Sequence, residues 1–535
     1  MKTVAVIGAG ASGIAAIKCS LDEGLEPTCF ERTDDIGGLW NYTESVRAGQ
    51  ACVMKSTVIN TSKEMMSYSD FPIPNEYPMF LHNTHVKRYF DTYVDHFNLK
   101  KRIRFQTEVL KIKPTADFYK TGQWDIKIKD SKTGKEEDFI FDAVLVCTGH
   151  HAHENMPDFP GLKEFQGKVI HSHTYKNTHG YEGKSVVVIG IGNSGGDAAV
   201  ELSRVASQVY LSTRRGSWVF SRTGGSGLPV DMIVVRRWLD SLLNALPVNL
   251  VNWMAKKWLN GRIDHKAYAL EPEHGPLQQH PTANDELPNR ISCGSIVIKP
   301  NIKRFTRTGV IFDDDSKIEN LDHVILATGY VFGFPFIDKS VLDVKDNKIE
   351  MYKYIFPPEQ SRHTLAVIGC FQPIGALMPV SEMQCRLATR VFKGDVTLPS
   401  KEDMWEDIKM KREQMAARFV TSKRHTIQVD FINYMDQLAT LNGNRPNFLK
   451  LMVTDPVLAF TCFFGPCSPY QFRLHGSQTW PGARKAIMTQ WDNATYALRT
   501  RATGGMQESS WAMMYILMFV MLIVAYMFRS CCVHD

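Results

Sequence analysis

The chain has 535 residues and a formal net charge of +6; 44% of its residues are hydrophobic and 22% are charged. This length allows roughly two to four globular domains, and so small a net charge argues against nucleic acid as a partner. The 11 cysteines are dispersed, include no CxxC pair and have no partner histidines at ligand spacing. We therefore expect reduced thiols, no disulfide framework and no metal site.

A strand, a glycine turn and a helix open the chain. Residues 4–7 are apolar, and a helical run begins near residue 11. A helix start leaves N–H groups unpaired and carries the positive end of the helix dipole, so it favours a phosphate. Glycines spaced as GxGxxG allow the turn, the approach of a pyrophosphate and close packing of helix on strand. The candidate cofactor-binding residues are Gly8, Ala9, Gly10, Ala11, Ser12 and Gly13.

The residues after this turn extend the expected dinucleotide site. A second strand over residues 27–30 ends at Glu31, whose carboxylate can accept hydrogen bonds from the hydroxyls of an adenosine ribose. Two glycines then precede Leu39 and Trp40, which we expect to lie against a flat ring system; a simple turn with a buried tryptophan is the alternative. Only three residues precede the first strand, which leaves no room for a cleavable signal peptide, so this unit should fold in the cytosol.

Asn60 and Thr61 follow an apolar run and offer neutral donors and acceptors. Such side chains can hold a flavin edge or a nicotinamide without bringing an acid close to it. They can equally cap a helix.

Further strands are expected over residues 105–112, 124–128 and 141–147. The last of them ends in a Thr-Gly turn, which commonly closes the first half of a dinucleotide-binding domain. We interpret His150 and His151, which follow it, as a surface turn rather than as metal ligands.

The opening pattern recurs after a strand over residues 185–189. The candidate residues of this second turn are Gly190, Gly192, Ser194, Gly195, Gly196 and Asp197. The next strand, residues 208–212, is followed by Arg214 and Arg215 in place of an acid. Arginine can bind a 2′-phosphate that an acid would repel, so Arg214 predicts NADP rather than NAD at this turn; a solvated surface pair is the alternative.

Residues 228–290 interrupt the alternation of strands and helices and are expected to form a helical insertion. Its amphipathic part, residues 238–259, should lie over the substrate side or against a membrane. His280 is most simply a loop histidine, although a place in the active site is the alternative.

The chain then returns to its first unit through strands at 321–325 and 365–369 and a helix at 381–392. We expect an α/β fold with two Rossmann-like dinucleotide-binding domains, one for FAD and one for NADPH. The expected division is an FAD domain from 1–153 and 331–445, an NADP domain from 154–330, and a membrane-proximal region from 446–510.

An uncharged, apolar stretch over residues 511–528 spans about 27 Å as a helix, close to the hydrocarbon thickness of a thin bilayer. Tyrosine and tryptophan lie near its ends, and arginines flank it. We expect a C-terminal transmembrane anchor that contacts membrane lipid; a buried helix docked on the body is the alternative.

Two other classes of protein pair nucleotide sites of this kind. A flavin disulfide reductase needs a redox cysteine pair near the flavin, and the absence of a CxxC motif argues against it. A cofactor-bearing sensor or partner-binding protein would not need every nucleotide motif intact, as they are here.

One further motif carries a resemblance to a known family. Phe165, Gly167, His171 and Tyr175 follow the pattern FxGx3Hx3Y immediately before the second glycine turn. This pattern, together with the other motifs above, resembles the flavin-containing monooxygenases along the whole chain, specifically the vertebrate microsomal members of the N-oxide-forming type. The resemblance implies an endoplasmic reticulum membrane location, with the catalytic body facing the cytosol. It leaves the oligomeric state open, a homo-oligomer included.

The resemblance also implies a reaction. NADPH reduces FAD, and molecular oxygen then gives a flavin C4a-hydroperoxide that oxygenates a soft nitrogen or sulfur nucleophile of a small, xenobiotic-type molecule. Oxygen insertion into ketones of the Baeyer–Villiger type, and an NADPH oxidase activity that releases hydrogen peroxide, are the alternatives. By the same resemblance, Asn60 is the candidate catalytic residue that positions NADP+ and steadies the oxygenated flavin. His171 and Tyr175 are expected to shape the domain junction.

Overall fold

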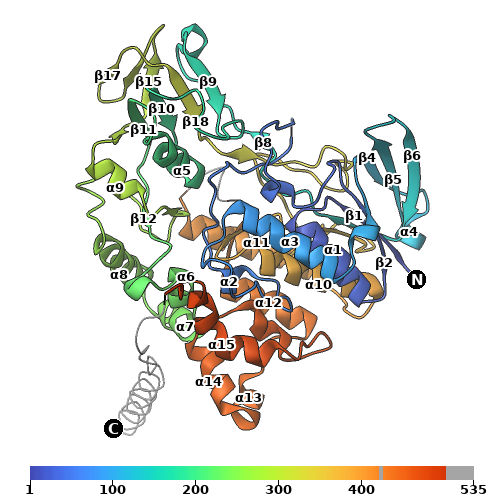
Figure 1. Ribbon diagram of the computed structural model, residues 1–535. Coiled ribbons are helices and arrows are strands. Elements are labelled where there is room, and N and C mark those ends of the chain that lie inside the picture. Colours follow the sequence, from blue (N-terminus) through green and yellow to red (C-terminus); the bar gives the residue numbers. More distant parts are fainter. Residues whose placement is uncertain (48, 421–425, 502–535) are drawn as a thin grey trace, which may run out of the picture.

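The computed structural model describes residues 1–47, 49–420 and 426–501. A five-stranded parallel sheet organises the N-terminal unit, with strand order β20-β7-β1-β2-β3 (Figure 1). Its strands are β1 (Thr3–Ile7), β2 (Glu26–Phe30), β3 (Ile103–Arg104), β7 (Ala143–Val146) and β20 (Leu365–Val367). The central strands are continuous apolar runs, as expected for a sheet that is covered on both faces.

A second five-stranded parallel sheet has the order β14-β11-β10-β18-β9. Its strands are β9 (Lys168–His171), β10 (Ser185–Ile189), β11 (Gln208–Ser212), β14 (Ile296–Lys299) and β18 (His323–Leu326). The expected α/β fold with two Rossmann-type sheets is therefore confirmed. The FxGx3Hx3Y motif overlaps β9, which adds the edge strand beside β18.

In each parallel sheet an antiparallel sheet is inserted in the chain directly before a strand next to the strand that opens the glycine turn: β7 beside β1, and β18 beside β10. In the first unit this is an antiparallel sheet of β4 (Thr107–Pro114), β5 (Trp124–Asp130) and β6 (Glu136–Phe141). In the second it is the sheet of β15 (Ile302–Phe305), β16 (Val310–Phe312) and β17 (Lys317–Ile318). The smaller pairs are β8 (His153–Glu154) with β19 (Tyr330–Val331), β12 (Val219–Phe220) with β13 (Thr282–Ala283), and β21 (Gln372–Ile374) with β22 (Gln428–Asp430).

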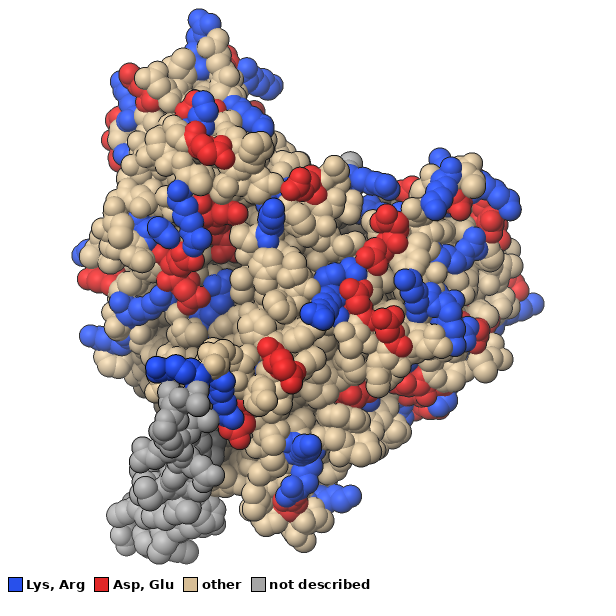
Figure 2. All heavy atoms as spheres, in the orientation of Figure 1, with Lys and Arg blue, Asp and Glu red and all other residues tan. Residues whose placement is uncertain are grey.

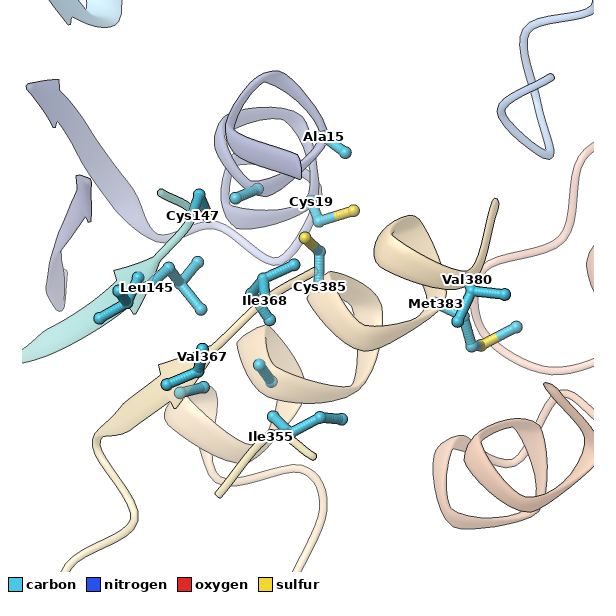
Figure 3. Packing of buried hydrophobic residues seen from close by; sticks show 14 of the residues in the cluster. Ala15, Cys19, Leu145, Cys147, Ile355, Val367, Ile368, Val380, Met383 and Cys385 are labelled. Carbon is cyan, nitrogen blue, oxygen red and sulfur yellow. The ribbon is translucent and has the colours of Figure 1, made fainter. Parts of the chain in front are cut away.

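The main core lies where the chain returns to its first sheet. α1 (Ala11–Asp22) packs against α10 (Met378–Lys393), and Figure 3 shows Cys19 of α1 beside Cys385 of α10, above Ile368 and Leu145. These side chains are fully buried or nearly so. α2 (Lys63–Met66), α3 (Asn83–His96), α4 (Phe118–Thr121) and the short helix Gly38–Trp40 complete the helices of the first half of this unit.

The helical insertion is present but is divided differently from the sequence prediction. The expected amphipathic run at 238–259 forms two helices, α7 (Arg237–Ala245) and α8 (Val248–Asn260), which meet at Leu246 and Pro247. Proline has no N–H to donate and sterically disfavours helical backbone in the residue before it, so one helix ends there and the next begins. α6 (Val230–Val234) and α9 (Leu287–Ser292) flank this pair.

The C-terminal region is helical. It consists of α11 (Lys401–Arg418), α12 (Phe431–Asn442), α13 (Phe448–Thr454), α14 (Pro456–Phe464) and α15 (Ala483–Tyr496). Within the described residues, no helix is both long and apolar enough to cross a bilayer. The expected anchor at 511–528 lies outside the described residues. On the face shown in Figure 2, basic and acidic side chains are interspersed, in keeping with the small net charge.

Candidate functional site

A cavity of about 620 Å³ opens at the carboxyl ends of the first parallel sheet. This is the position at which open α/β sheets bind their ligands. Of the residues predicted from the sequence, the cavity is lined by Gly8, Gly10, Ala11, Ser12, Glu31, Leu39 and Trp40.

The glycine turn in this cavity has the geometry that its spacing predicts. Gly8 has φ +96°, in the left-handed region that favours glycine. A Cβ on Gly13 would lie 1.8 Å from the carbonyl oxygen of Gly8, so Gly13 serves the packing of helix on strand and faces away from the cavity. α1 begins after Gly10 and has no acidic residue in its first turn, so its N-terminus can receive a phosphate.

Glu31 is buried beside this turn and already accepts several hydrogen bonds. Its Oε2 accepts from the N–H of Ala9 at 2.7 Å, and its Oε1 accepts from both the N–H and the hydroxyl of Thr33. A carboxylate has about four acceptor positions, so one remains for a ligand hydroxyl. Ala9 therefore contributes its backbone to the placement of Glu31 and lies behind the cavity lining.

The cavity has further walls that the sequence did not reveal. Val109 and Leu110 of β4 and Phe336 supply apolar surface, while Gly37 and Gly38, the two glycines noted before Leu39, contact the first turn. An apolar wall together with a turn that accepts phosphate fits a dinucleotide with a flat ring system such as FAD. Neither β4 nor Phe336 carries a motif, and only the folding of the antiparallel sheet and the 333–336 loop brings them to the site.

His150 and His151 also line this cavity, so the prediction of a surface turn is wrong. Their rings lie 4.1 Å apart, and Nδ1 of His150 lies 3.1 Å from the carbonyl oxygen of Gly369. Burial lowers the pKa of His150 to about 4 and lowers that of His151 well below its usual range. Both rings are therefore neutral at physiological pH. Within the described residues, no group of three metal-ligating side chains occurs.

The second glycine turn repeats the first. Gly190 has φ +108°, and a Cβ on Gly195 would lie 1.9 Å from the carbonyl oxygen of Gly190. α5 (Asn193–Leu202) begins after Gly192, again with no acid in its first turn. Gly192 and Ser194 are exposed at this helix start, whereas Gly195 and Gly196 are buried.

Residues 282–285 cover this second turn. The side chain of Asn193 accepts from the N–H of Ala283 at 2.9 Å, and Asp197 accepts from the side-chain amide of Asn284 at 2.8 Å. Burial raises the pKa of Asp197 to about 6, although Arg222 and Asn284 act to lower it. His280 lies just before this segment, and burial lowers its pKa to about 4.

Arg214 and Arg215 lie exposed at the end of β11. In the described chain neither forms an ion pair with a carboxylate. An arginine in this position is available to a 2′-phosphate, so this turn fits NADPH.

Asn60 and Thr61 do not line the cavity of the first turn. The Oδ1 of Asn60 instead accepts a hydrogen bond from Nε of Arg222 at 3.1 Å. Ser62, two residues further, is held by Asp231, whose Oδ2 accepts from the backbone N–H of Ser62 at 2.7 Å. Both partners belong to the second unit, so the loop that carries Asn60 is fixed from the NADP side.

His171 of the FxGx3Hx3Y motif and the nearby His173 lie close to the first unit, and Nε2 of His173 is 2.6 Å from the carbonyl oxygen of Gln50. Nε2 of His171 lies 3.1 Å from the carbonyl oxygen of Gly329, and the ring of His171 contacts Tyr330. His173 pairs with Glu154 at 2.9 Å. The hydroxyl of Tyr175 donates to Glu201 on α5. Most of these contacts lie within the second unit, and of them only the contact with Gln50 involves a residue of the cavity lining.

Comparison with known proteins gives consistent matches. The family model described as flavin-binding monooxygenase-like matches residues 1–531. The chain is 51% identical over 504 residues to flavin-containing monooxygenase 5 of Oryctolagus cuniculus, covering 94% of each chain. It is 48% identical over 509 residues to flavin-containing monooxygenase 3 of Homo sapiens, covering 95% of each.

Among solved structures, S-allyl-L-cysteine S-oxygenase from Allium sativum matches with a TM-score of 0.63 at 24% identity, covering 85% of this chain and 92% of that one. An open crystal structure of cyclohexanone monooxygenase matches with a TM-score of 0.59 at 16% identity, covering 83% and 98%. At these identities the likeness to the two structures concerns the fold.

Proposed function

The chain belongs to the flavin-binding monooxygenase family, and on that premise we propose that it oxygenates soft nucleophilic nitrogen or sulfur atoms of small molecules. It is a flavin-dependent monooxygenase whose cofactors are FAD and NADPH. The finer part of the proposal is that a flavin C4a-hydroperoxide delivers the oxygen atom.

The observation that carries this proposal is the presence of two similar glycine turns, one next to an acidic side chain and the other next to a basic one. The first has the buried carboxylate of Glu31, which suits the ribose hydroxyls of FAD. The second has the exposed guanidinium of Arg214, which suits the 2′-phosphate of NADPH. When bound, the two cofactors supply a hydride and a site for activating oxygen.

The residues of the chain provide binding, orientation and a neutral environment. The N-termini of α1 and α5 would hold the two pyrophosphates, and Leu39 and Trp40 would lie against the ring system. His150 and His151 are neutral in the cavity, so they bring no positive charge to it at physiological pH. No nucleophile or catalytic triad is required of the protein, because the oxygen atom comes from O2.

Stopped-flow absorbance tests the proposal. The purified enzyme is reduced with NADPH without oxygen and then mixed with aerated buffer. We expect a long-lived flavin–oxygen adduct that is discharged on adding a thioether or a tertiary amine. Discharge by a ketone alone would replace the proposal with Baeyer–Villiger chemistry. Immediate return of oxidised flavin with stoichiometric peroxide would make the protein an NADPH oxidase.

We also propose that the body faces the cytosol on an endoplasmic reticulum membrane and that residues 511–528 anchor it. Large apolar side chains stand exposed in the C-terminal helical region and in the insertion: Leu449 and Val453 on α13, and Trp253 and Trp258 on α8. Exposed tryptophan and aliphatic side chains favour a membrane interface.

Deleting residues 511–535 tests the anchor. We expect a body that retains FAD and leaves the membrane fraction in whole or in part. If the shortened enzyme stays fully with membranes, the anchor lies elsewhere, and replacing Trp253 and Trp258 with serine in the same background would show whether α8 provides it.

A further inference from the structure

Arg222 connects the two halves of the site through contacts that no motif reveals. It lies in the second unit, immediately after the β12 strand and Ser221, with its side chain 12% exposed. Its Nε donates to Oδ1 of Asn60 at 3.1 Å, and its Nη2 lies 3.5 Å from the carbonyl oxygen of Val58. One guanidinium therefore reaches both the backbone and the side chain of the loop that carries Asn60.

The contact fixes which way the amide of Asn60 points. A guanidinium has only donors, so the atom of Asn60 that faces it must be the oxygen. The NH2 group of the amide is then directed away from Arg222 and remains a donor for a bound ligand. Rotating the amide by half a turn would set an NH2 group against an N–H group and would lose a charge-assisted hydrogen bond.

Arg222 is itself held by the segment over the NADP turn. Its Nη1 donates to Oδ2 of Asp285 at 2.8 Å, and its backbone N–H donates to Oδ1 of the same carboxylate at 3.0 Å. Burial alone would raise the pKa of Asp285, but hydrogen bonds from Ser221 and Arg222 hold that pKa below its usual value. Asp285 is therefore charged at physiological pH and anchors the arginine.

The two residues that precede Asp285 complete the connection. Asn284 donates to Asp197 of α5, and Ala283 donates to Asn193 at the start of the same helix. A continuous series of contacts thus runs from the N-terminus of α5, through residues 283–285 and Arg222, to Asn60.

We propose that Arg222 is a positioning residue that orients the amide of Asn60 toward NADP+ and that takes its own place from the segment covering the NADP turn. The inference rests on the proposed function, and it takes the assignment of Asn60 to NADP+ from the family resemblance described above. In this arrangement the amide of Asn60 keeps its orientation only while residues 282–285 contact α5. The orientation of Asn60 therefore depends on how well the segment over the NADP turn is ordered.

A double-mutant cycle on the full-length, FAD-loaded enzyme tests this. The variants are Asn60→Ala, Arg222→Gln and their combination. Binding of NADP+ to the oxidised enzyme is measured by titration calorimetry, which involves no turnover. We expect each single change to raise the Kd about three- to tenfold and the combination to raise it no further than Asn60→Ala alone. The inference would be overturned if the double variant raised the Kd by the product of the two single increases, or if either single variant left the Kd unchanged.

Arg204→Gln is the matched control. Arg204 pairs with Glu286, the residue after Asp285, on an exposed surface and makes no contact with Asn60. We expect its Kd for NADP+ to stay within twofold of the original enzyme. If Arg222→Gln lowers the melting temperature or FAD content below that of Arg204→Gln, Asp285→Asn replaces it, and its effect must again vanish in the Asn60→Ala background.

A second readout separates this inference from the proposed function. The peroxide released per NADPH oxidised should rise in Arg222→Gln to the level seen in Asn60→Ala. Arg222→Lys keeps the charge but loses the planar guanidinium, so its peroxide release should lie between that of the original enzyme and that of Arg222→Gln. An original enzyme that already converts all oxygen to peroxide would refute the proposed oxygenation, and the calorimetric cycle would still decide the role of Arg222. If the original enzyme and the Arg222→Gln variant both release little peroxide per NADPH oxidised, the role of Arg222 is refuted and the proposed function is not.

Discussion

The two glycine turns have nearly the same backbone structure, although we propose that they bind two different nucleotides. Gly8 donates to the carbonyl of the last residue of β2, and Gly190 donates to the carbonyl of the last residue of β11. A Cβ on Gly13 or on Gly195 would meet a backbone oxygen at 1.8 or 1.9 Å. The strand, turn and helix are thus a repeated unit whose geometry is set by glycine packing.

What differs is the surroundings of each turn. Gly37 and Gly38 cover the first turn, and a buried carboxylate stands behind it. Side chains of residues 282–285 cover the second, and exposed arginines stand behind it. At the fifth residue of the helix, α1 has Ala15 where α5 has Asp197. We therefore expect these neighbouring residues to decide which nucleotide each turn binds, and each difference between the two turns can be tested separately.

The largest effect is expected where the turns are alike. Gly13→Ala and Gly195→Ala should each destabilise their unit by more than about 4 kcal/mol, because the new Cβ collides with backbone that cannot move aside. Thermal unfolding and FAD content would measure this. Gly192→Ala is the control, since nothing lies within 4 Å of its Cβ position. Its melting temperature should change little, and a large loss there would show that the collision is not the cause.

Arg214→Ala should remove the distinction between NADPH and NADH at the second turn. We expect kcat/KM for NADPH to fall about 10- to 100-fold and that for NADH to stay within about twofold, because only NADPH carries the 2′-phosphate. Steady-state kinetics with both nucleotides measures this. Arg215→Ala is the matched neighbour and should have the smaller effect. A preference that survives in Arg214→Ala would assign the phosphate to another residue.

Glu31→Gln should weaken the first turn without unfolding it. The carboxylate accepts from three donors, and an amide has only one oxygen, so at least one donor would face an NH2 group. We expect the Kd for FAD, measured by flavin fluorescence on reconstitution, to rise about tenfold. Glu108→Gln changes an exposed acid that lines the same cavity and should leave FAD binding nearly unchanged. Equal losses in both variants would mean that charge in the cavity matters more than the contacts of Glu31.

The smallest effect concerns Asp197, which has no acidic counterpart in α1. Its pKa is raised to about 6, so folding favours the protonated form. The stability that this contributes is complete below about pH 4 and is lost as the pH rises through 6. Asp197→Asn should abolish this part of the pH dependence, on the order of 1 kcal/mol between pH 5 and pH 8, measured by chemical unfolding. Parallel curves for the two proteins would show that Asp197 does not titrate in this range.

Local patterns in the sequence predicted the repeated unit well. The strand expected at 185–189 coincides with β10, and the strand expected at 365–369 begins where β20 begins, because an apolar run that ends at a glycine leaves few alternatives. The division at Pro247 was missed, although proline is a signal for it. The positions of His150 and His151 were missed because exposure depends on what the fold places opposite a turn.

The contact of Asn60 with Arg222 could not be predicted from local pattern at all. The two residues are 162 positions apart, and each is an ordinary polar residue in its own surroundings. Only the packing of residues 222–231 against the 58–62 loop brings them together. The same holds for Asp231 and Ser62, 169 positions apart. Long-range polar contacts of this kind decide the geometry of a site but leave no periodicity or spacing in the chain.

The return of the chain to its first sheet has a consequence for biosynthesis. β20 and α10 begin at residues 365 and 378, so the first sheet and the face of α1 stay incomplete until more than two thirds of the chain has left the ribosome. The second sheet draws all its strands from residues 168–326 and can close earlier. We therefore expect the unit built on the second sheet to complete its fold before the unit that precedes it in sequence. A chain terminated before residue 365 should leave the apolar surface of α1 uncovered and open to chaperones.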